Sequence, residues 1–200
     1  MPLTFPGVLL TDKLKQETQA AHEKAEQLLG PHLSAIRDKH EYASLLKMLY
    51  GFYHPLEQLI GEFVTPAILE DIHSRRNAAL ILLDLDAMKI PREPLPLCGD
   101  LPVVDSVPAA LGALYVLEGS TLGGRMISKM LQKKESLSVV ETELNFFSGY
   151  KEDTGPKWTL FKTVINQWDH EAAAIVMAAN ASFESLSDWI SQTMEHGSKA

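Results

Sequence analysis

Apolar residues recur every three to four positions along most of this chain, a spacing typical of helices that bury one face. The first such stripe consists of Leu14, Thr18, Ala21, His22, Ala25 and Leu29. It predicts a helix that begins near Thr11 or Asp12 and is stopped by Gly30-Pro31. Alternating apolar and polar positions, which would indicate half-buried strands, are nearly absent. The pattern therefore predicts an all-α fold.

Helical spacing continues beyond this first predicted helix. It covers residues 38–63, 68–88, 106–133, 139–147 and 157–194. Pro55 is expected to bend or restart the helix that contains it. Ser106 followed by Pro108 is a helix start, because serine is a favoured N-cap and proline is tolerated in the first turn. The proline-rich stretch 91–102 is predicted to be a connection that is too short to separate two domains.

Length, charge and cysteine content exclude several classes of partner and of metal site. With 200 residues, of which 46% are hydrophobic, we expect one domain over 1–200 with flexible ends at 1–10 and 195–200. A net charge of -8 disfavours a nucleic-acid partner. The lone cysteine, Cys98, excludes an internal disulfide and cysteine-rich zinc or iron–sulfur sites. The chain has neither a long apolar run nor a signal-peptide pattern, so we expect a cytoplasmic protein without a membrane partner.

His22 is unusual because it lies within the apolar stripe of the first predicted helix. Glu26 follows one turn later, where it can accept a hydrogen bond from the imidazole. Lys15 lies two turns earlier, so a cation projects from roughly the same side. Two interpretations stay open from these residues alone: a core histidine with a satisfied hydrogen bond, which is the commoner case, and a ligand histidine.

A glycine-rich segment interrupts the apolar helix predicted over 106–133. Its sequence is Gly119-Ser120-Thr121-Leu122-Gly123-Gly124-Arg125. Each interior glycine costs about 1 kcal/mol relative to alanine, so a compensating role is expected. A membrane dimer face is excluded by Glu118 and Arg125, and a phosphate-binding loop by Arg125 and Met126 at its required Lys and Ser or Thr positions. Tight helix packing and a kinked helix that faces a ligand remain, and the second explains the cost better.

The other histidines carry weaker signals. Glu70 and His73 form one Glu-x-x-His unit, but a bundle di-iron centre requires two. The remaining histidines are interpreted as surface or capping residues, namely His32, His40, His54, His170 and His196. The pattern of a serine nucleophile elbow and that of paired catalytic carboxylates are not apparent.

Two segments resemble the haem oxygenase family. The stretch from Leu14 to Glu26 resembles its proximal helix, and the stretch from Leu114 to Arg125 resembles the distal helix of its bacterial branch. Downstream residues are similar to the haem oxygenases found beside bacterial phytochromes; they are Phe146-Phe147-Ser148-Gly149-Tyr150, Thr154-Gly155-Pro156-Lys157-Trp158 and Phe161. The similarity runs in order along nearly the whole chain.

This resemblance implies a multihelical fold with haem between the proximal helix and a kinked, glycine-rich distal helix. It implies that His22 is the axial iron ligand, that Lys15 and Lys162 pair with haem propionates, and that Phe183 is an aromatic wall. Further cofactor contacts are expected from Glu26, Tyr115 and Arg125. The distal residues expected to act in catalysis are Gly119, Ser120, Gly123 and Gly124.

The implied activity is oxidative cleavage of haem, as both cofactor and substrate, to biliverdin, carbon monoxide and ferrous iron. O2 and an external electron donor, a ferredoxin or a flavin reductase, would be required, and a bacteriophytochrome is a candidate recipient of biliverdin. Ser120 stands where animal enzymes have the aspartate that organises a proton-delivering water. That departure leaves two alternatives: a haem carrier or sensor of the same fold without turnover, and a relative of that fold without haem.

Overall fold

The structure is a computed structural model, and it describes residues 9–197. The α-helices are α1 (Leu10–Glu17), α2 (Gln19–Ala35), α3 (Lys39–Gly61), α4 (Ala79–Ala87), α5 (Val107–Gln132), α6 (Asn145–Ser148), α7 (Thr154–Asn166) and α8 (Ala172–Gly197). Short 3-10 turns are η1 (Ile72–Ser74), η2 (Glu141–Glu143), η3 (Lys151–Asp153) and η4 (Asp169–Glu171). No strand occurs over these residues, which confirms the predicted all-α class.

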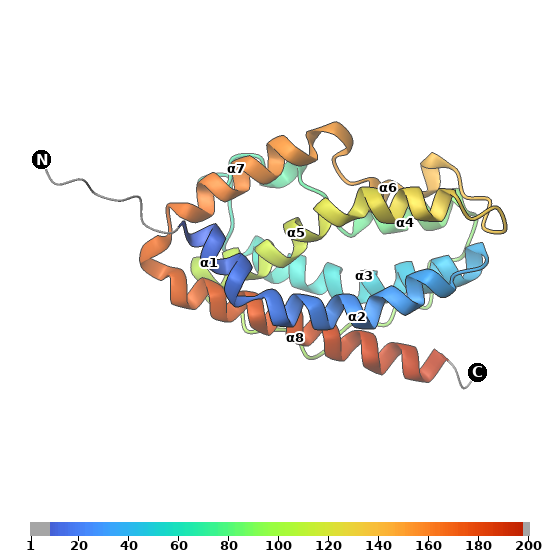
Figure 1. Cartoon of the computed structure of the whole chain (residues 1–200), viewed down its shortest axis with the longest axis horizontal. Coiled ribbons are helices and arrows are strands. Elements are labelled where there is room, and N and C mark those ends of the chain that lie inside the picture. The colour runs from blue at the N-terminus through green and yellow to red at the C-terminus, as the bar shows by residue number, and fades with distance from the viewer. Residues whose placement is uncertain (1–8, 198–200) are drawn as a thin grey trace, which may run out of the picture.

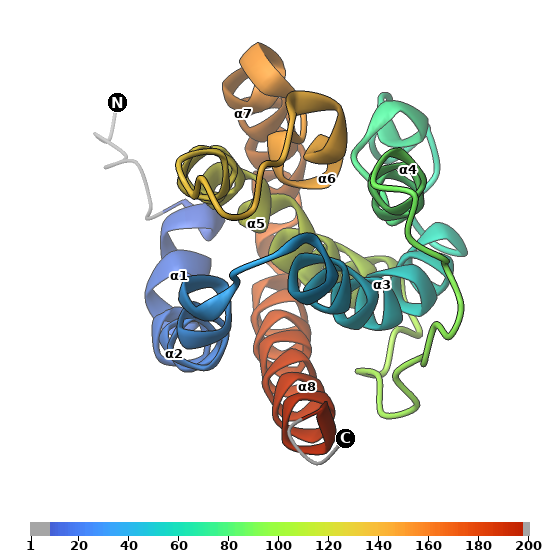
Figure 2. The same ribbon diagram turned by 90° about the vertical axis from the view of Figure 1, so that its right-hand side faces the viewer.

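Helix α8 is a common partner, because α1, α2, α3 and α5 all pack against it (Figures 1 and 2). Its crossing with α5 is close, because a Cβ added at Gly112 would lie 2.3 Å from the carbonyl oxygen of Ile175. Its far half is joined to α3 by the indole of Trp189, which donates to the Met48 carbonyl at 2.8 Å. Helices α2 and α5 are therefore held through a shared partner.

Helix α5 is one continuous helix by hydrogen bonding, and its two halves run in different directions (Figures 1 and 2). The predicted start is confirmed, because the Ser106 side chain accepts a hydrogen bond from Ala109 N. The first half is buried on most of its faces, whereas the second half has a polar and open side. The predicted interruption at the glycines is thus a change in the axis of the helix and not a break in it.

The first predicted helix is two helices. Thr18 separates α1 from α2, and its hydroxyl donates to the Leu14 carbonyl at 2.7 Å. The predicted stop at Gly30-Pro31 is wrong, because α2 continues to Ala35. The last carbonyls of this extension are satisfied from a distance: the ammonium of Lys134 donates to three carbonyl oxygens at 2.6–3.2 Å, those of Leu33, Ser34 and Ile36. A lysine about a hundred residues away in the chain thus supports the turn beyond the proline.

The helix predicted over 68–88 forms only in its second half, as α4. The segment before it is made of turns and η1, and it carries Arg75 and Arg76 to the middle of α5. Helix α4 is joined to α6 by Asp84, which is fully buried and accepts hydrogen bonds from the backbone of Asn145 and Phe146. These tertiary contacts replace the helix that the local pattern favours.

The structure describes only part of the two terminal segments, 1–10 and 195–200, that are expected to be flexible. Residues 1–8 and 198–200 of those segments lie outside the described residues. Leu10, by contrast, is buried in the first turn of α1. In the described part of the chain, no helix combines the length and the apolarity needed to cross a bilayer.

Candidate functional site at the proximal and distal helices

Helices α2 and α5 run in the same direction along the molecule (Figure 1). They approach each other near their common end, where the side chain of Tyr115 on α5 meets that of Thr18 at the start of α2. Burial raises the pKa of Tyr115. His22 on α2 and Gly119 on α5 each lie one helical turn beyond that contact. The two predicted segments therefore bring His22 and Gly119 to the same level of the fold.

His22 is not a core histidine, because 51% of its side chain is exposed. Its Nε2 lies 3.4 Å from Oε1 of Glu26, one turn later on the same helix. The ring of Phe183, which α8 provides, meets the imidazole edge-on with centroids 5.4 Å apart. The imidazole is thus oriented by a carboxylate and an aromatic ring while half of its surface stays accessible.

The glycines of α5 serve two different purposes. A Cβ added at Gly119 or Gly123 would meet no atom within 4 Å, so these two residues face open space. At Gly124 the same addition would lie 2.4 Å from the carbonyl oxygen of Phe147, so Gly124 allows close packing against α6. Tight helix packing therefore accounts for Gly124, whereas Gly119 and Gly123 leave bare backbone exposed, and their predicted role in facing a ligand stays a prediction.

Gly119 and Gly123 belong to an open stripe along α5. This open stripe comprises Tyr115, Gly119, Leu122, Gly123 and Met126, which share one face at helical spacing. Leu122 is 48% exposed and Met126 77% exposed, although both are large and apolar. The stripe thus presents bare backbone, flanked by unburied apolar side chains, over two turns of helix. A flat apolar ligand would fit such a surface.

Ser120 is on the edge of the open stripe, and its hydroxyl is fully engaged. It donates to the Leu117 carbonyl at 2.7 Å and accepts from the Tyr53 hydroxyl at 2.9 Å and from Nη2 of Arg76 at 2.8 Å. One donated and two accepted bonds use the whole capacity of a hydroxyl. The sequence pattern did not reveal Tyr53 and Arg76, because no local spacing relates them to Ser120.

Arg76 is held among aromatic rings. Its guanidinium lies 5.0 Å from the ring centroid of Tyr53 and 4.5 Å from that of Phe146. Its Nη2 also donates to the Leu117 carbonyl at 2.7 Å, whereas its Nε is buried without a hydrogen-bond partner among the described residues. A cation with spare donor capacity therefore lies beside Ser120.

The two lysines predicted to bind propionates come from neighbouring helices. Thr11 N donates to Oδ1 of Asn166 at 3.0 Å, which joins α1 to α7. Lys15 and Lys162 each lie one turn from this bond on their own helices. Both bracket the same helix contact, at the end of the molecule where Tyr115 meets Thr18.

Arg125, in contrast, lies in a separate groove between α5 and the η2–η3 segment. This groove has a volume of about 280 Å³ and is lined by Arg125, Ser128, Lys129, Gln132, Glu141, Ser148, Lys151 and Glu152. Arg125 is therefore on the flank of α5 and not in the open stripe.

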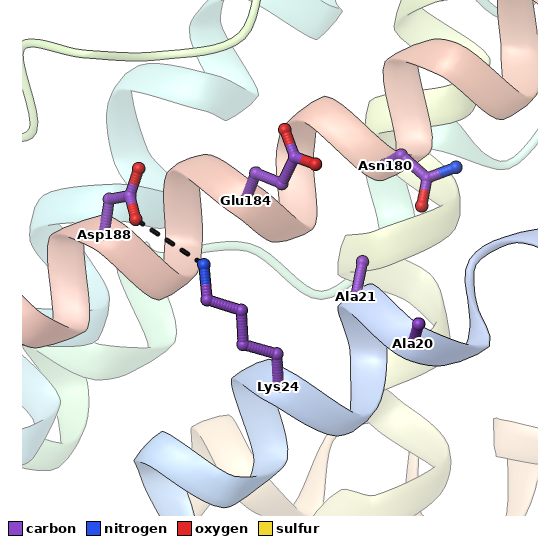
Figure 3. A pocket seen from close by; sticks show the side chains of 6 residues that line it. All are labelled: Ala20, Ala21, Lys24, Asn180, Glu184 and Asp188. Atoms are coloured by element: carbon purple, nitrogen blue, oxygen red, sulfur yellow. Dashed lines mark ion pairs between the residues drawn. The ribbon is translucent and has the colours of Figure 1, made fainter.

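A second groove, of about 490 Å³, separates α2 from α8 (Figure 3). Its lining residues are Ala20, Ala21, Lys24, Asn180, Glu184 and Asp188, and the ion pair between Lys24 and Asp188, at 3.8 Å, spans it. Lys24 is two residues from His22, a spacing that places side chains on different faces of a helix. This groove is thus distinct from the surface around His22.

Comparisons with known proteins agree with this geometry. The described chain shares its fold with two solved bacterial proteins. One is the NO- and CO-bound haem oxygenase of Neisseria meningitidis, with a TM-score of 0.77, 18% identity and 94% of each chain covered. The other is haem oxygenase-1 from the cyanobacterium Synechocystis sp. PCC6803 in complex with haem, with a TM-score of 0.66, 19% identity and 92% of each chain covered. The fold class of this chain is therefore that of haem oxygenases.

Sequence comparison leads to the same family. The model described as "Heme oxygenase" matches residues 9–81, which include α1, α2 and α3. A curated relative named haem oxygenase, from Xanthomonas campestris pv. campestris (strain 8004), is 29% identical over 137 residues, or 68% of this chain and 79% of the relative. The sequence matches are thus to haem oxygenases, through a family model over the N-terminal part of this chain and a relative of 29% identity.

Proposed function

We propose that this protein is a haem oxygenase, which opens haem oxidatively to biliverdin and releases carbon monoxide and ferrous iron. The observation that carries the proposal is the pairing of a half-exposed histidine on α2 with bare glycine backbone at the same level of α5. Bound haem would supply the iron at which O2 is activated and the macrocycle that is opened.

His22 is proposed as the axial ligand. A neutral imidazole is a suitable ligand for an iron that must bind O2. Ligation through one ring nitrogen leaves the other N–H free to donate to Glu26, which already lies within 3.4 Å of the ring. Phe183 restricts the rotation of the ring from the α8 side. This set fits a single protein ligand for a haem iron.

The open stripe of α5 is proposed to cover the other side of the haem. The absence of a Cβ at Gly119 and Gly123 lets the backbone approach a flat macrocycle closely, while Leu122 and Met126 bury their apolar surface against it. Lys15 and Lys162 would hold the propionates as ion pairs. Gly124 would support this wall through its packing on α6.

The proton route is proposed to depend on Tyr53 and Arg76 as well as on Ser120. Because the Ser120 hydroxyl has no remaining hydrogen-bond capacity, it orients these two groups and does not bind water itself. The Tyr53 oxygen can still accept, and the guanidinium of Arg76 can still donate. The two groups are suited to hold a water at the edge of the open stripe and to pass a proton through it.

The remaining partners and the location are inferred from the chemistry and from the subgroup resemblance. With one cysteine, the chain cannot hold a four-cysteine iron–sulfur cluster, so electrons come from a separate ferredoxin or flavin reductase. Delivery of biliverdin to a bacteriophytochrome in the cytoplasm is supported by the resemblance of residues 146–161 to haem oxygenases encoded beside such receptors.

A spectroscopic assay tests the function. Haem added to the purified protein should give a Soret band, and a reductant under air should convert it to biliverdin absorption with release of carbon monoxide. His22→Ala should alter or abolish the Soret band. A band that persists unchanged with several electron donors would identify a haem carrier instead, an alternative favoured by the engaged Ser120 hydroxyl. Absence of any Soret band would contradict both functions.

A further inference from the structure

Glu118 is a buried carboxylate that the proposed chemistry does not use. It lies inside α5, directly before Gly119, and its side chain is only 3% exposed. A buried charge is tolerated when it is both ion-paired and hydrogen-bonded. Apolar side chains of the same volume are often as stabilising as a buried ion pair or more so, which favours a role for this carboxylate other than packing.

The carboxylate of Glu118 is held by two groups from other elements. Nη1 of Arg75 donates to Oε2 at 2.5 Å, and the Tyr150 hydroxyl donates to Oε1 at 2.7 Å. Arg75 is itself fixed, because its Nε donates to Oδ1 of Asp71 at 2.8 Å and its Nη2 to the Lys157 carbonyl at 3.1 Å. Asp71 also pairs with the Lys157 ammonium at 2.8 Å, which anchors the array to α7. Charges thus alternate from the centre of α5 to α7.

Glu118 also holds the next residue, Arg76, by a second route. The Tyr150 hydroxyl that donates to Glu118 accepts a hydrogen bond from the backbone N–H of Arg76 at 2.8 Å. The Arg76 side chain then returns to α5 and donates to the Leu117 carbonyl and the Ser120 hydroxyl. These hydrogen bonds form a closed loop. It runs from Glu118 to the two consecutive arginines and returns to α5 at Leu117 and Ser120, on either side of Glu118.

We propose that Glu118 is a positioning residue, which fixes the guanidinium of Arg76 against Ser120 and so sets the polar edge of the open stripe. The inference rests on the proposed function for its consequence in catalysis, although the placement of Arg76 by Glu118 does not depend on haem. The carboxylate orients the Arg75–Arg76 segment from two directions, which an apolar residue could not do. The unpaired Nε of Arg76 is consistent with a cation held for its position.

The test compares Glu118→Gln with Glu143→Gln. Glutamine keeps the shape of the side chain and can still accept from Tyr150, but it no longer neutralises Arg75. Glu143 is a matched control, because it is also buried and also pairs with a cation, Lys39 at 2.6 Å, but lies in η2. Glu118→Asp, which restores the charge, should recover part of any loss.

The first measurement uses the haem-free protein. Amide hydrogen exchange in the peptide that spans residues 117–124 should become about tenfold faster in Glu118→Gln, because the loss of a charge-assisted bond lowers the free energy of local opening. Glu143→Gln should leave that peptide unchanged. Equal effects of the two variants, or no effect of Glu118→Gln, would overturn the proposal even if the chain proved to have no haem oxygenase activity.

The second measurement uses the haem complex. The pH midpoint of the ferric haem spectrum should shift in Glu118→Gln and stay as in the unmodified protein in Glu143→Gln, because Arg76 would no longer be fixed beside the ligand side of the haem. A loss of stability without a spectral shift would reduce Glu118 to a structural ion pair. Should Glu118→Gln fail to fold, Tyr150→Phe keeps every charge and removes the one hydroxyl that links Glu118 to the Arg76 backbone, so it should give the same changes at smaller size.

Discussion

At the scale of single residues, Tyr53 is the group whose role is easiest to isolate. Tyr53→Phe removes one hydroxyl that donates to Ser120 and leaves the ring under Arg76 in place. We expect biliverdin formation to slow about a hundredfold, at the lower end of effects for positioned proton-transfer groups, with little change in haem affinity. Single-turnover spectra and haem titration measure the two effects separately.

Tyr50→Phe is the matched control for this prediction. Tyr50 lies on the same helix, and its ring stacks on His54 with centroids 4.9 Å apart. Removal of its hydroxyl should leave the rate unchanged. Equal rates of biliverdin formation in the two variants would show that proton transfer does not require the Tyr53 hydroxyl.

The single residue Glu57 should make the stability of the folded protein depend on pH. Its carboxylate accepts from Ala78 N at 2.9 Å, but burial dominates and raises its pKa from 4.5 to about 7. The folded state therefore binds this proton more tightly than the unfolded state, so stability is lost as the pH rises from about 4.5 to 7. Because Glu57 is only partly buried, we expect Glu57→Gln to be more stable than the unmodified protein by about 2 kcal/mol at pH 8.

Urea unfolding at several pH values measures this difference. The advantage of Glu57→Gln should shrink steadily from pH 8 to pH 5, where most of the unmodified carboxyl is protonated in the folded protein. A difference that is constant over this range would show that the carboxyl is not the cause.

Residue-scale contacts are also where sequence reasoning reached its limit. His22 and the glycine segment could be predicted, because each breaks a local pattern: a polar side chain in an apolar stripe, and glycines in a helix interior. Tyr53 and Arg76 could not be predicted, because they lie 67 and 44 residues from Ser120. Only the folded chain brings them together.

At the scale of elements, α5 provides a prediction with opposite signs for neighbouring glycines. In the haem-free protein, Gly119→Ala and Gly123→Ala should each raise the free energy of unfolding by up to about 1 kcal/mol, because the new Cβ meets open space and favours the helix. Gly124→Ala should lower it by about 1–3 kcal/mol, because its Cβ would overlap the Phe147 carbonyl. Chemical denaturation measures all three changes.

The two stabilising variants, Gly119→Ala and Gly123→Ala, should have the opposite effect on haem affinity. The added methyl groups of Gly119→Ala and Gly123→Ala would separate α5 from the macrocycle, so the more stable variants should bind haem more weakly. Gly30→Ala is a suitable control, because Gly30 also faces open space but lies on α2 away from the open stripe. Stabilisation without loss of haem affinity at Gly119 would argue against contact between this backbone and haem.

Element boundaries show why periodicity alone does not suffice. It predicted the existence of the long helices and the start of α5, where a local serine supplies the cap. It failed at Pro31, where Lys134 supports an extra turn, and between residues 68 and 78, where Arg75 and Arg76 require an irregular backbone. In each failure a distant side chain satisfies groups that the local sequence leaves unpaired.

At the scale of the whole molecule, the net charge of -8 opposes the binding of a ligand with two carboxylates. Lys15 and Lys162 are the proposed local attraction that offsets this repulsion. Salt screens both effects, so between about 0.05 and 0.5 M salt the haem affinity of the unmodified protein should change little. In a Lys15→Ala, Lys162→Ala double variant only the repulsion remains, so its affinity should be lower and should rise with salt.

Haem titrations at two salt concentrations provide the measurement. Lys13→Ala is the control, because Lys13 is on the same helix as Lys15 but pairs with Glu17 at 3.8 Å. An affinity that falls with salt in the double variant would contradict the assignment of these two lysines.

The all-α class was predictable at this scale, because it needs only the absence of strand patterns and the sum of many helical ones. The arrangement of the helices was not predictable from spacing, because the contacts that fix it are made by α8 with helices that precede it by 40 to 160 residues. The resemblance to a known family implied only that the proximal and distal helices lie on either side of the haem.

The position of α8 at the end of the chain has a consequence for folding during synthesis. A ribosome makes α2 and α5 long before it makes the helix on which both of them pack. Until α8 has been made, the histidine and the glycines lack the helix on which both of their own helices pack, so the proposed haem site cannot form completely. Synthesis order therefore postpones the site until the protein is almost complete.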